Sequence, residues 1–261
     1  MQPAIGVFDS GIGGLTVLRA IRHLFPAARL VYLGDTARVP YGTKSPTTVL
    51  RYAHQAATFL LSRKVDVLVV ACNTASAVAL DELASELPIP VVGVIEPGAQ
   101  AAVQASVTRR IGVIGTEGTI QSGAYERSIR LLAPDAAVST VACPLFVPIT
   151  EAGWADHQVA HLSAAEYLAP LQAAGIDTLV LGCTHYPLLQ STLAKCLGPK
   201  VGLVDSALAT ARTLHPYVGV VSGGGGSAEF FVTDAPQRFC RIGGGFLGME
   251  LGNVQQVVLE N

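Results

Sequence analysis

Two cysteines, Cys72 and Cys183, stand where a thiol could carry out acid–base chemistry. Each follows a short apolar run typical of a buried strand and precedes a segment of helical length. Open α/β sheets bind ligands beyond the carboxyl ends of their strands, and the positive end of a helix dipole favours a thiolate. Polar side chains follow both cysteines directly: Asn73 and Thr74 after the first, Thr184 and His185 after the second.

A pair of thiols on opposite sides of a ligand suits the inversion of a carbon centre. One thiolate takes a proton from one face of the carbon, while the other thiol supplies a proton to the opposite face. A cysteine is also a common buried residue, and this is our interpretation of Cys143, Cys196 and Cys240. The cysteines form no C-x-x-C motif, so the sequence does not support a zinc knuckle or a thioredoxin-like site.

The loop Asp9–Gly14, with the sequence Asp-Ser-Gly-Ile-Gly-Gly, follows the first predicted strand. One interpretation is a dinucleotide-binding turn with Asp35 as the ribose-binding carboxylate, but Thr16 occupies the position of the third glycine. A second interpretation is recognition of an ammonium group by Asp9, with backbone N–H groups of the loop nearby. A third is an ordinary glycine turn that caps a helix.

The polar segment Gly34–Pro46 follows the second predicted strand, at the sheet edge where ligands bind. Within it, Tyr41 is a candidate to donate a hydrogen bond from its hydroxyl to a carboxylate, and Ser45 is a candidate cap of the next helix. Farther along, Glu151 is either a helix cap or a carboxylate behind the site, and the sequence leaves both interpretations open.

The elements that position these residues alternate along the chain. Short apolar runs predict strands, and Ala- and Leu-rich segments between most of them predict helices, which together indicate βαβ units and a doubly wound, mostly parallel α/β fold. The predicted strands are Ile5–Phe8, Leu30–Leu33, Val67–Ala71, Val91–Ile95, Ile111–Ile114, Val138–Ala142, Thr178–Leu181, Val201–Val204 and Phe230–Thr233. The predicted helices include Leu15–Phe25, Thr47–Ser62, Ala75–Leu87 and Ala160–Ala174. The run Gly223–Gly226 predicts a flexible turn before the last strand.

The chain contains an internal repeat. Ile5–Ser10 matches Ile111–Thr116, and Asp66–Cys72 matches Asp177–Cys183, in the same order and at nearly equal offsets. Similar composition of any two buried strands is the alternative explanation. We expect two α/β lobes related by duplication, with one thiol from each lobe facing a cleft between them.

Composition excludes several classes of protein. Hydrophobic residues make up 50 % of the chain and charged residues 14 %, a balance that excludes a disordered chain. The formal net charge of −2 lacks the basic footprint of a dedicated nucleic-acid binder. No apolar run reaches the ~20 residues of a membrane helix, and the N-terminus lacks a signal-peptide pattern. We therefore expect a cytoplasmic protein with reduced thiols and neither a membrane nor a nucleic-acid partner.

Together, these motifs resemble those of bacterial glutamate racemases. The segments that carry the resemblance come in family order and span nearly the whole chain: Gly6–Val17, Tyr32–Thr36, Pro40–Gly42, Ala71–Ala77, Gly93–Gly98, Leu181–Leu188 and Phe231–Asp234. The resemblance implies a cofactor-independent isomerase that interconverts L- and D-glutamate and supplies D-glutamate for peptidoglycan synthesis, hence for cell-wall biogenesis and cell shape. It implies no metal and no cofactor.

The resemblance also implies roles for individual residues. Cys72 and Cys183 match the two acid–base residues, one for each face of the substrate. The residues that assist proton movement would be Asp9, Glu151 and His185. The substrate-binding residues would be Asp9, Ser10, Tyr41, Gly42, Asn73, Thr74, Thr184 and His185. Thr116 and Thr119 are further candidates that face the substrate.

The family plan implies that residues 1–95 and 207–261 form the first lobe and that residues 96–206 form the second. Family members are often homodimers, so we expect a homodimer. Two alternatives are a racemase of aspartate or a hydantoin on the same plan, and a binding or regulatory protein that has lost catalysis, since some glutamate racemases also inhibit DNA gyrase. Retention of both cysteines with their polar neighbours argues against loss of function.

Overall fold

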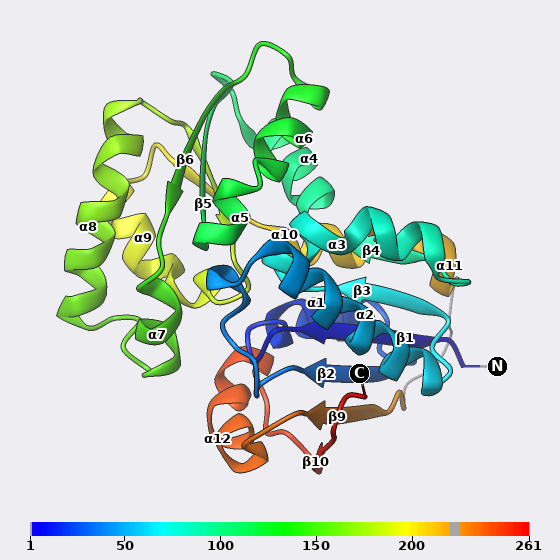
Figure 1. The fold of residues 1–261 in the computed structure, drawn as a ribbon. Helices are drawn as coiled ribbons and strands as arrows, with labels where there is room; N and C mark the ends of the chain where they lie inside the picture. Colours follow the sequence, from blue (N-terminus) through cyan, green and yellow to red (C-terminus); the bar gives the residue numbers. More distant parts are fainter. Residues whose placement is uncertain (1, 220–224, 261) are drawn as a thin grey trace.

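The computed structural model describes residues 2–219 and 225–260, which contain two separate parallel sheets (Figure 1). The six-stranded sheet has the order β10-β9-β2-β1-β3-β4, and the four-stranded sheet has the order β6-β5-β7-β8. We call each sheet with its covering helices the first lobe and the second lobe, respectively. The expected fold, two lobes of parallel α/β structure, is confirmed.

The predicted strands all correspond to observed ones, with small differences at the ends. The strands of the first lobe are β1 (Ala4–Asp9), β2 (Arg29–Gly34), β3 (Val67–Val70), β4 (Val91–Gly93), β9 (Ala228–Val232) and β10 (Val254–Gln256). Those of the second lobe are β5 (Arg110–Gly115), β6 (Ala137–Ala142), β7 (Thr178–Gly182) and β8 (Gly202–Asp205). The predicted strand Val91–Ile95 is too long because Ile95 begins a helix. In the predicted glycine turn, Gly223 and Gly224 lie outside the described residues.

Helices cover both faces of the first sheet. On one face lie α1 (Leu15–Leu24), α10 (Ser206–Arg212) and α12 (Pro236–Leu247); on the other lie α2 (Pro46–Ser62) and α3 (Asn73–Glu86). Successive residues of β1 face opposite ways, so Val7 packs in one apolar cluster and Phe8 in the other. Ser45 caps α2 as expected, because its hydroxyl accepts a hydrogen bond from the Thr48 backbone N–H at 3.3 Å.

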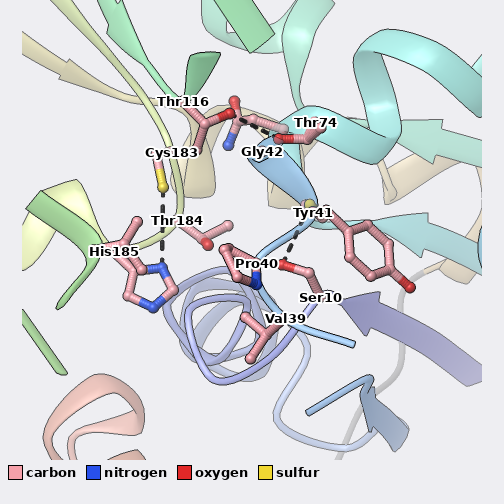
Figure 2. Close-up of a pocket in the computed structure, with 13 residues that line it drawn as sticks. Ser10, Val39, Pro40, Tyr41, Gly42, Thr74, Thr116, Cys183, Thr184 and His185 are labelled. Carbon is pink, nitrogen blue, oxygen red and sulfur yellow. Dashed lines mark hydrogen bonds between the residues drawn. The ribbon is translucent and has the colours of Figure 1, made fainter. Parts of the chain in front are cut away.

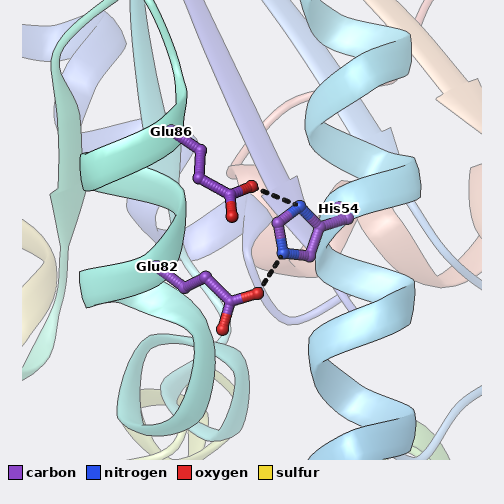
Figure 3. A group of neighbouring side chains, drawn as sticks. All are labelled: His54, Glu82 and Glu86. Carbon is purple, nitrogen blue, oxygen red and sulfur yellow. Dashed lines mark hydrogen bonds and ion pairs between the residues drawn. The ribbon is translucent and has the colours of Figure 1, made fainter.

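A histidine between two glutamates joins the outer surfaces of α2 and α3 (Figure 3). His54 Nε2 lies 3.0 Å from Glu82 Oε1, and His54 Nδ1 lies 3.6 Å from Glu86 Oε2. The two glutamates are four residues apart and therefore share one helix face. The contact ties the two helices together at their solvent-exposed side.

The second sheet is also covered on both faces. One face carries α4 (Ile95–Ala105) and α6 (Ala124–Leu132), and the other carries α7 (Phe146–Glu151), α8 (Gln158–Ala173) and α9 (Gln190–Leu197). The remaining short elements are η1 (Tyr41–Thr43), α5 (Glu117–Gln121), η2 (Tyr186–Leu189) and α11 (His215–Val218). Within the described residues, no helix combines the length and the apolar character that a membrane span requires.

The two lobes have the same core topology, as the sequence repeat predicts. The order β2-β1-β3-β4 in the first sheet matches β6-β5-β7-β8 in the second. The registers also match, since Ile5 pairs with Val67 and Ile111 pairs with Thr178. The carboxyl ends of β3 and β7 are therefore equivalent positions, and the next residues in the chain lead to the two cysteines.

Candidate active site

A small pocket lies where the carboxyl ends of the central strands of both lobes meet (Figure 2). Ser10, Cys72, Thr116 and Cys183 follow β1, β3, β5 and β7, respectively, and all four line it. The full set of lining residues is Ser10, Val39, Pro40, Tyr41, Gly42, Cys72, Asn73, Thr74, Thr116, Val147, Cys183, Thr184 and His185. The cavity volume is about 20 Å³, which is room for about one water molecule.

Most sequence-predicted site residues come together here. Nine of the eleven predicted site residues line the pocket, the exceptions being Asp9 and Glu151, which lie behind its wall in contact with residues that do line it. The sequence placed Val39 and Pro40 in the segment Gly34–Pro46 without giving them a role, and it did not suggest Val147; these apolar side chains carry no chemical signal. They contribute to the exclusion of water from the pocket.

Cys72 is held at the N-terminus of α3, where its backbone forms the cap of the helix. Its thiol donates a hydrogen bond to Ser10 Oγ at 3.6 Å. Burial raises the pKa of the Cys72 thiol to about 11, and the nearby Asp9 carboxylate acts in the same direction. The thiol is therefore protonated at neutral pH in this closed form, despite its place at a helix N-terminus.

Cys183 stands at the start of a relay of polar side chains. Its Sγ lies 3.9 Å from His185 Nδ1, and the other ring nitrogen, Nε2, lies 3.0 Å from Glu151 Oε1 (Figure 2 shows the first contact). Burial raises the pKa of Cys183 well above its ordinary value. Burial also favours the neutral form of Glu151, but hydrogen bonds and charges from His185 and Arg238 outweigh it and lower the pKa of Glu151. Of the two interpretations of Glu151, the carboxylate behind the site agrees with this geometry.

Asp9 lies beneath the pocket and contacts the second lobe. It is fully buried, its Oδ2 accepts a hydrogen bond from the Gly11 backbone N–H at 3.0 Å, and its Oδ1 accepts one from Thr184 Oγ1 at 3.4 Å. Burial raises the pKa of Asp9, although the charge of His185 and the hydrogen bonds oppose this effect. A buried carboxyl group whose charge acts on both thiols is thus available to hold or accept a proton.

Away from Asp9 and His185, the pocket is lined by hydroxyl groups and one amide. The Oγ1 atoms of Thr74 and Thr116 lie 2.8 Å apart, and each lies within hydrogen-bond distance of Thr119 Oγ1. The Oδ1 of the buried Asn73 accepts a hydrogen bond from Tyr125 at 2.7 Å, while its Nδ2 has no partner in the described part of the chain. This amide is therefore a free donor at the pocket. Tyr125, which orients it, has no sequence signal, because its role depends on contact between the lobes.

Tyr41 lies at the pocket with its hydroxyl already in use. The hydroxyl donates to Asp35, and Figure 2 shows the ring pointing away from Cys183. Asp35 also accepts hydrogen bonds from Arg38 Nε at 2.6 Å and Thr233 Oγ1 at 2.9 Å. Because Asp35 is fully buried and both of its oxygens already accept hydrogen bonds, the geometry does not support its interpretation as a ribose-binding carboxylate.

The side chains at the pocket are of the types that carry out proton transfer. Among the described residues, one group of three His, Cys, Asp or Glu side chains brings its ligand atoms within 4.8 Å of one another, namely His54, Glu82 and Glu86. None of the three lines the pocket. At the pocket itself, two thiols, a carboxyl group and a His–Glu pair surround a space from which water is largely excluded.

Comparisons with known proteins agree with this chemistry. A family model described as "Asp/Glu/Hydantoin racemase" matches residues 5–225. A glutamate racemase from Geobacter metallireducens is 54 % identical over 265 residues, which cover 98 % of this chain and 97 % of the relative.

Solved structures of similar proteins have the same fold. A glutamate racemase isoform from Bacillus anthracis superposes with a TM-score of 0.93 at 40 % identity and covers 98 % of both chains. A glutamate racemase from Francisella tularensis, crystallised in complex with D-glutamate, gives a TM-score of 0.92 at 37 % identity and covers 99 % of this chain and 98 % of that one. Because nearly the whole chain is covered, the likeness of fold extends over both lobes.

Proposed function

Since this chain belongs to the Asp/Glu/hydantoin racemase family, and within it to the glutamate racemases, we propose that it interconverts L- and D-glutamate by proton transfer at Cys72 and Cys183. The observation that carries the proposal is the position of the two thiols. They follow equivalent strands of two lobes with the same topology, and both line one pocket. Thiols contributed by opposite lobes can reach opposite faces of one α-carbon.

The reaction is a two-step exchange of one proton. A thiolate on one side takes the α-proton and becomes a thiol, and the electron pair of the C–H bond stays on the substrate as a carbanion stabilised by the α-carboxylate. The thiol on the other side then donates its proton to the opposite face and becomes a thiolate. The substrate leaves inverted, and the reverse reaction uses the same two groups in exchanged roles.

The substrate itself helps to generate the thiolate. Burial keeps both thiols protonated in the closed pocket, so one of them has to lose its proton before catalysis. An ammonium group that enters beside them is an opposite charge, which favours the ionised form of a thiol. Asp9 and the His185–Glu151 pair lie next to the thiols and are the groups that would take this proton.

Hydrogen-bond donors on the other side of the pocket would hold the α-carboxylate. The unpartnered Nδ2 of Asn73 and the hydroxyls of Thr74 and Thr116 face this side. Preorganised donors in a space without water stabilise the negative charge that develops on the carboxylate as the α-proton leaves. The Tyr41 hydroxyl has no part in this step because Asp35 accepts its hydrogen bond.

Substrate entry requires the lobes to separate. A cavity of about 20 Å³ has room for about one water molecule and is far too small for glutamate. We propose that residues 1–95 with 207–261 move as one body and residues 96–206 as the other. The division follows the two sheets, since β1–β4, β9 and β10 belong to one and β5–β8 belong to the other.

The proposal includes the setting in which the enzyme works. D-glutamate made by this reaction would enter peptidoglycan synthesis, in the cytoplasm, with the enzyme acting as a homodimer and without metal or cofactor. The support for this setting is membership of the family, together with the D-glutamate complex of the Francisella tularensis relative.

The test is a time course of optical rotation with purified enzyme and L-glutamate, in the presence of a metal chelator and without added cofactor. The expected result is decay of the rotation to zero, with D-glutamate giving the mirror-image curve and L-aspartate giving no change. Decay with aspartate and not with glutamate would reassign the substrate. No decay with either, for a folded and reduced protein, would overturn the proposal.

A further inference from the structure

One ion pair joins the two lobes beside the relay at Cys183. Arg238, on α12 of the first lobe, places Nη2 at 2.7 Å from Glu151 Oε2, at the end of α7 in the second lobe. All other ion pairs among the described residues join groups within one lobe. Figure 1 shows α12 next to α7. The pair therefore exists only while these two helices are together.

The ion pair is the outer end of a chain of contacts that runs inward to the thiol. The side chain of Arg238 is 47 % exposed, that of Glu151 11 % and that of His185 4 %. Glu151 uses one oxygen for Arg238 and the other for His185 Nε2, and His185 Nδ1 faces Cys183. No further hydrogen bond to the Glu151 carboxylate exists within residues 2–219 and 225–260, so these two contacts alone orient it.

We propose that Arg238 is a positioning residue that assembles the Cys183 relay only when the lobes are closed. By holding Glu151 from across the lobe boundary, its guanidinium keeps the carboxylate on His185 and keeps the other ring nitrogen directed at Cys183. Separation of the lobes removes Arg238 while Glu151, His185 and Cys183 stay together in the second lobe. The inference rests on the proposed racemase function, because it assigns the purpose of the relay to that reaction.

Few charged groups surround Glu151, so the effect of Arg238 on it can be isolated. The charged or titratable groups that contact it are His185, from the loop after β7, and Arg238, from α12. Arg241, also on α12, lines a surface groove that includes Glu151 but makes no hydrogen bond or ion pair with it. Beyond His185 lie Cys183 and Asp9. Arg241 has no ion-pair partner among the described residues, which makes it a matched control on the same helix.

The experiment compares Arg238→Gln, Arg238→Lys and Arg241→Gln with the full-length wild-type enzyme. We expect Arg238→Gln to lower kcat by about tenfold, less than the roughly 10²–10⁴-fold cost of losing a proton-transferring group, with KM changed by less than about twofold. Arg238 lowers the pKa of Glu151, so its loss should also move the acid limb of the kcat–pH profile to higher pH. Arg238→Lys should restore most of both effects, and Arg241→Gln should show neither.

A second measurement does not depend on turnover. In protein labelled with ¹⁵N-histidine, Arg238→Gln should change the ring nitrogen signals of His185, and Arg241→Gln should leave them unchanged. Equal kcat, equal acid limbs and equal His185 signals in the two glutamine variants would overturn the proposal, as would a lysine variant as impaired as Arg238→Gln. If wild-type protein fails to racemise glutamate while the His185 signals respond to Arg238, the proposed function fails and the positioning role of Arg238 stands.

Discussion

Replacement of Gly13 by alanine should separate the lobes by about 1 Å and stop catalysis without unfolding the protein. A Cβ atom at this position would lie 2.2 Å from Thr184 Oγ1 and 2.5 Å from His185 Nδ1, both in the second lobe. Non-bonded heavy atoms rest at ~3.5 Å, so the neighbours have to retreat by about 1 Å. Since the obstacle belongs to the other lobe, a small rigid-body displacement relieves it.

This displacement should lower the rate of the reaction. A misplacement of about 1 Å reduces catalysis by roughly 10²-fold, which corresponds to about 2.7 kcal/mol of transition-state free energy. We expect kcat/KM for glutamate to fall by about this factor in both directions, measured by optical rotation. The melting temperature should change by less than about 3 °C, because neither core contains the clash.

Two glycines of the same turn are matched controls. A Cβ at Gly11 would lie 3.4 Å from Val39 Cγ2, which is an ordinary contact, so Gly11→Ala should keep activity and stability. A Cβ at Gly14 would lie 2.5 Å from the Asp9 Cβ within the first lobe, so Gly14→Ala should lower the melting temperature. Wild-type kcat/KM in Gly13→Ala, or unfolding of Gly13→Ala to the same degree as Gly14→Ala, would refute the reasoning.

Three further outcomes follow from the site. Cys72→Ala and Cys183→Ala should each abolish racemisation, because either direction needs both thiols, whereas Cys143→Ala should keep turnover; optical rotation decides, and near-wild-type turnover of either of the first two variants would contradict the assignment. Burial raises the pKa of Cys72 from its ordinary 9.0 to about 11, so between these pH values the folded state keeps a proton that the unfolded chain loses. The free energy of unfolding should therefore fall between about pH 9 and 11 by on the order of 2–3 kcal/mol more in wild type than in Cys72→Ala. Urea titrations that show the same pH dependence for both proteins would argue against this prediction. Tyr125→Phe removes the hydrogen bond that orients Asn73 and leaves a buried acceptor unpaired, which costs about 1–3 kcal/mol. The KM for glutamate should therefore rise at least about fivefold, and an unchanged KM would exclude this role of Asn73.

The sequence was sufficient for the parts of the structure that depend on local pattern. Apolar runs mark buried strands because parallel strands are covered on both faces, and Phe8 and Val7 face opposite clusters as that pattern requires. The repeat at Asp66–Cys72 and Asp177–Cys183 predicted equivalent ends of β3 and β7, which the matching strand order confirms. Strand β10 was not predicted, because Val254–Gln256 is a short edge strand with two polar residues and no apolar run.

Contacts between distant segments could not be predicted in the same way. Tyr125 reaches Asn73, and Arg238 reaches Glu151, only because the two lobes face each other. The Tyr41 hydroxyl has an acceptor within its own lobe, on Asp35, and no local pattern reveals that choice. Residue types indicated the chemistry of the pocket, while the partners of each group depend on the fold.

The most direct test of two-thiol catalysis is the early incorporation of deuterium from D₂O. Wild-type enzyme is mixed with L-glutamate, and the reaction is stopped after a few per cent of conversion so that each enantiomer can be isolated and its α-hydrogen determined by mass spectrometry. If Cys72 and Cys183 act from opposite faces, the D-glutamate formed carries deuterium while the remaining L-glutamate keeps its original hydrogen. D-glutamate that retains the original hydrogen would mean that one group both removes and returns the proton, and would contradict the assignment of the two thiols.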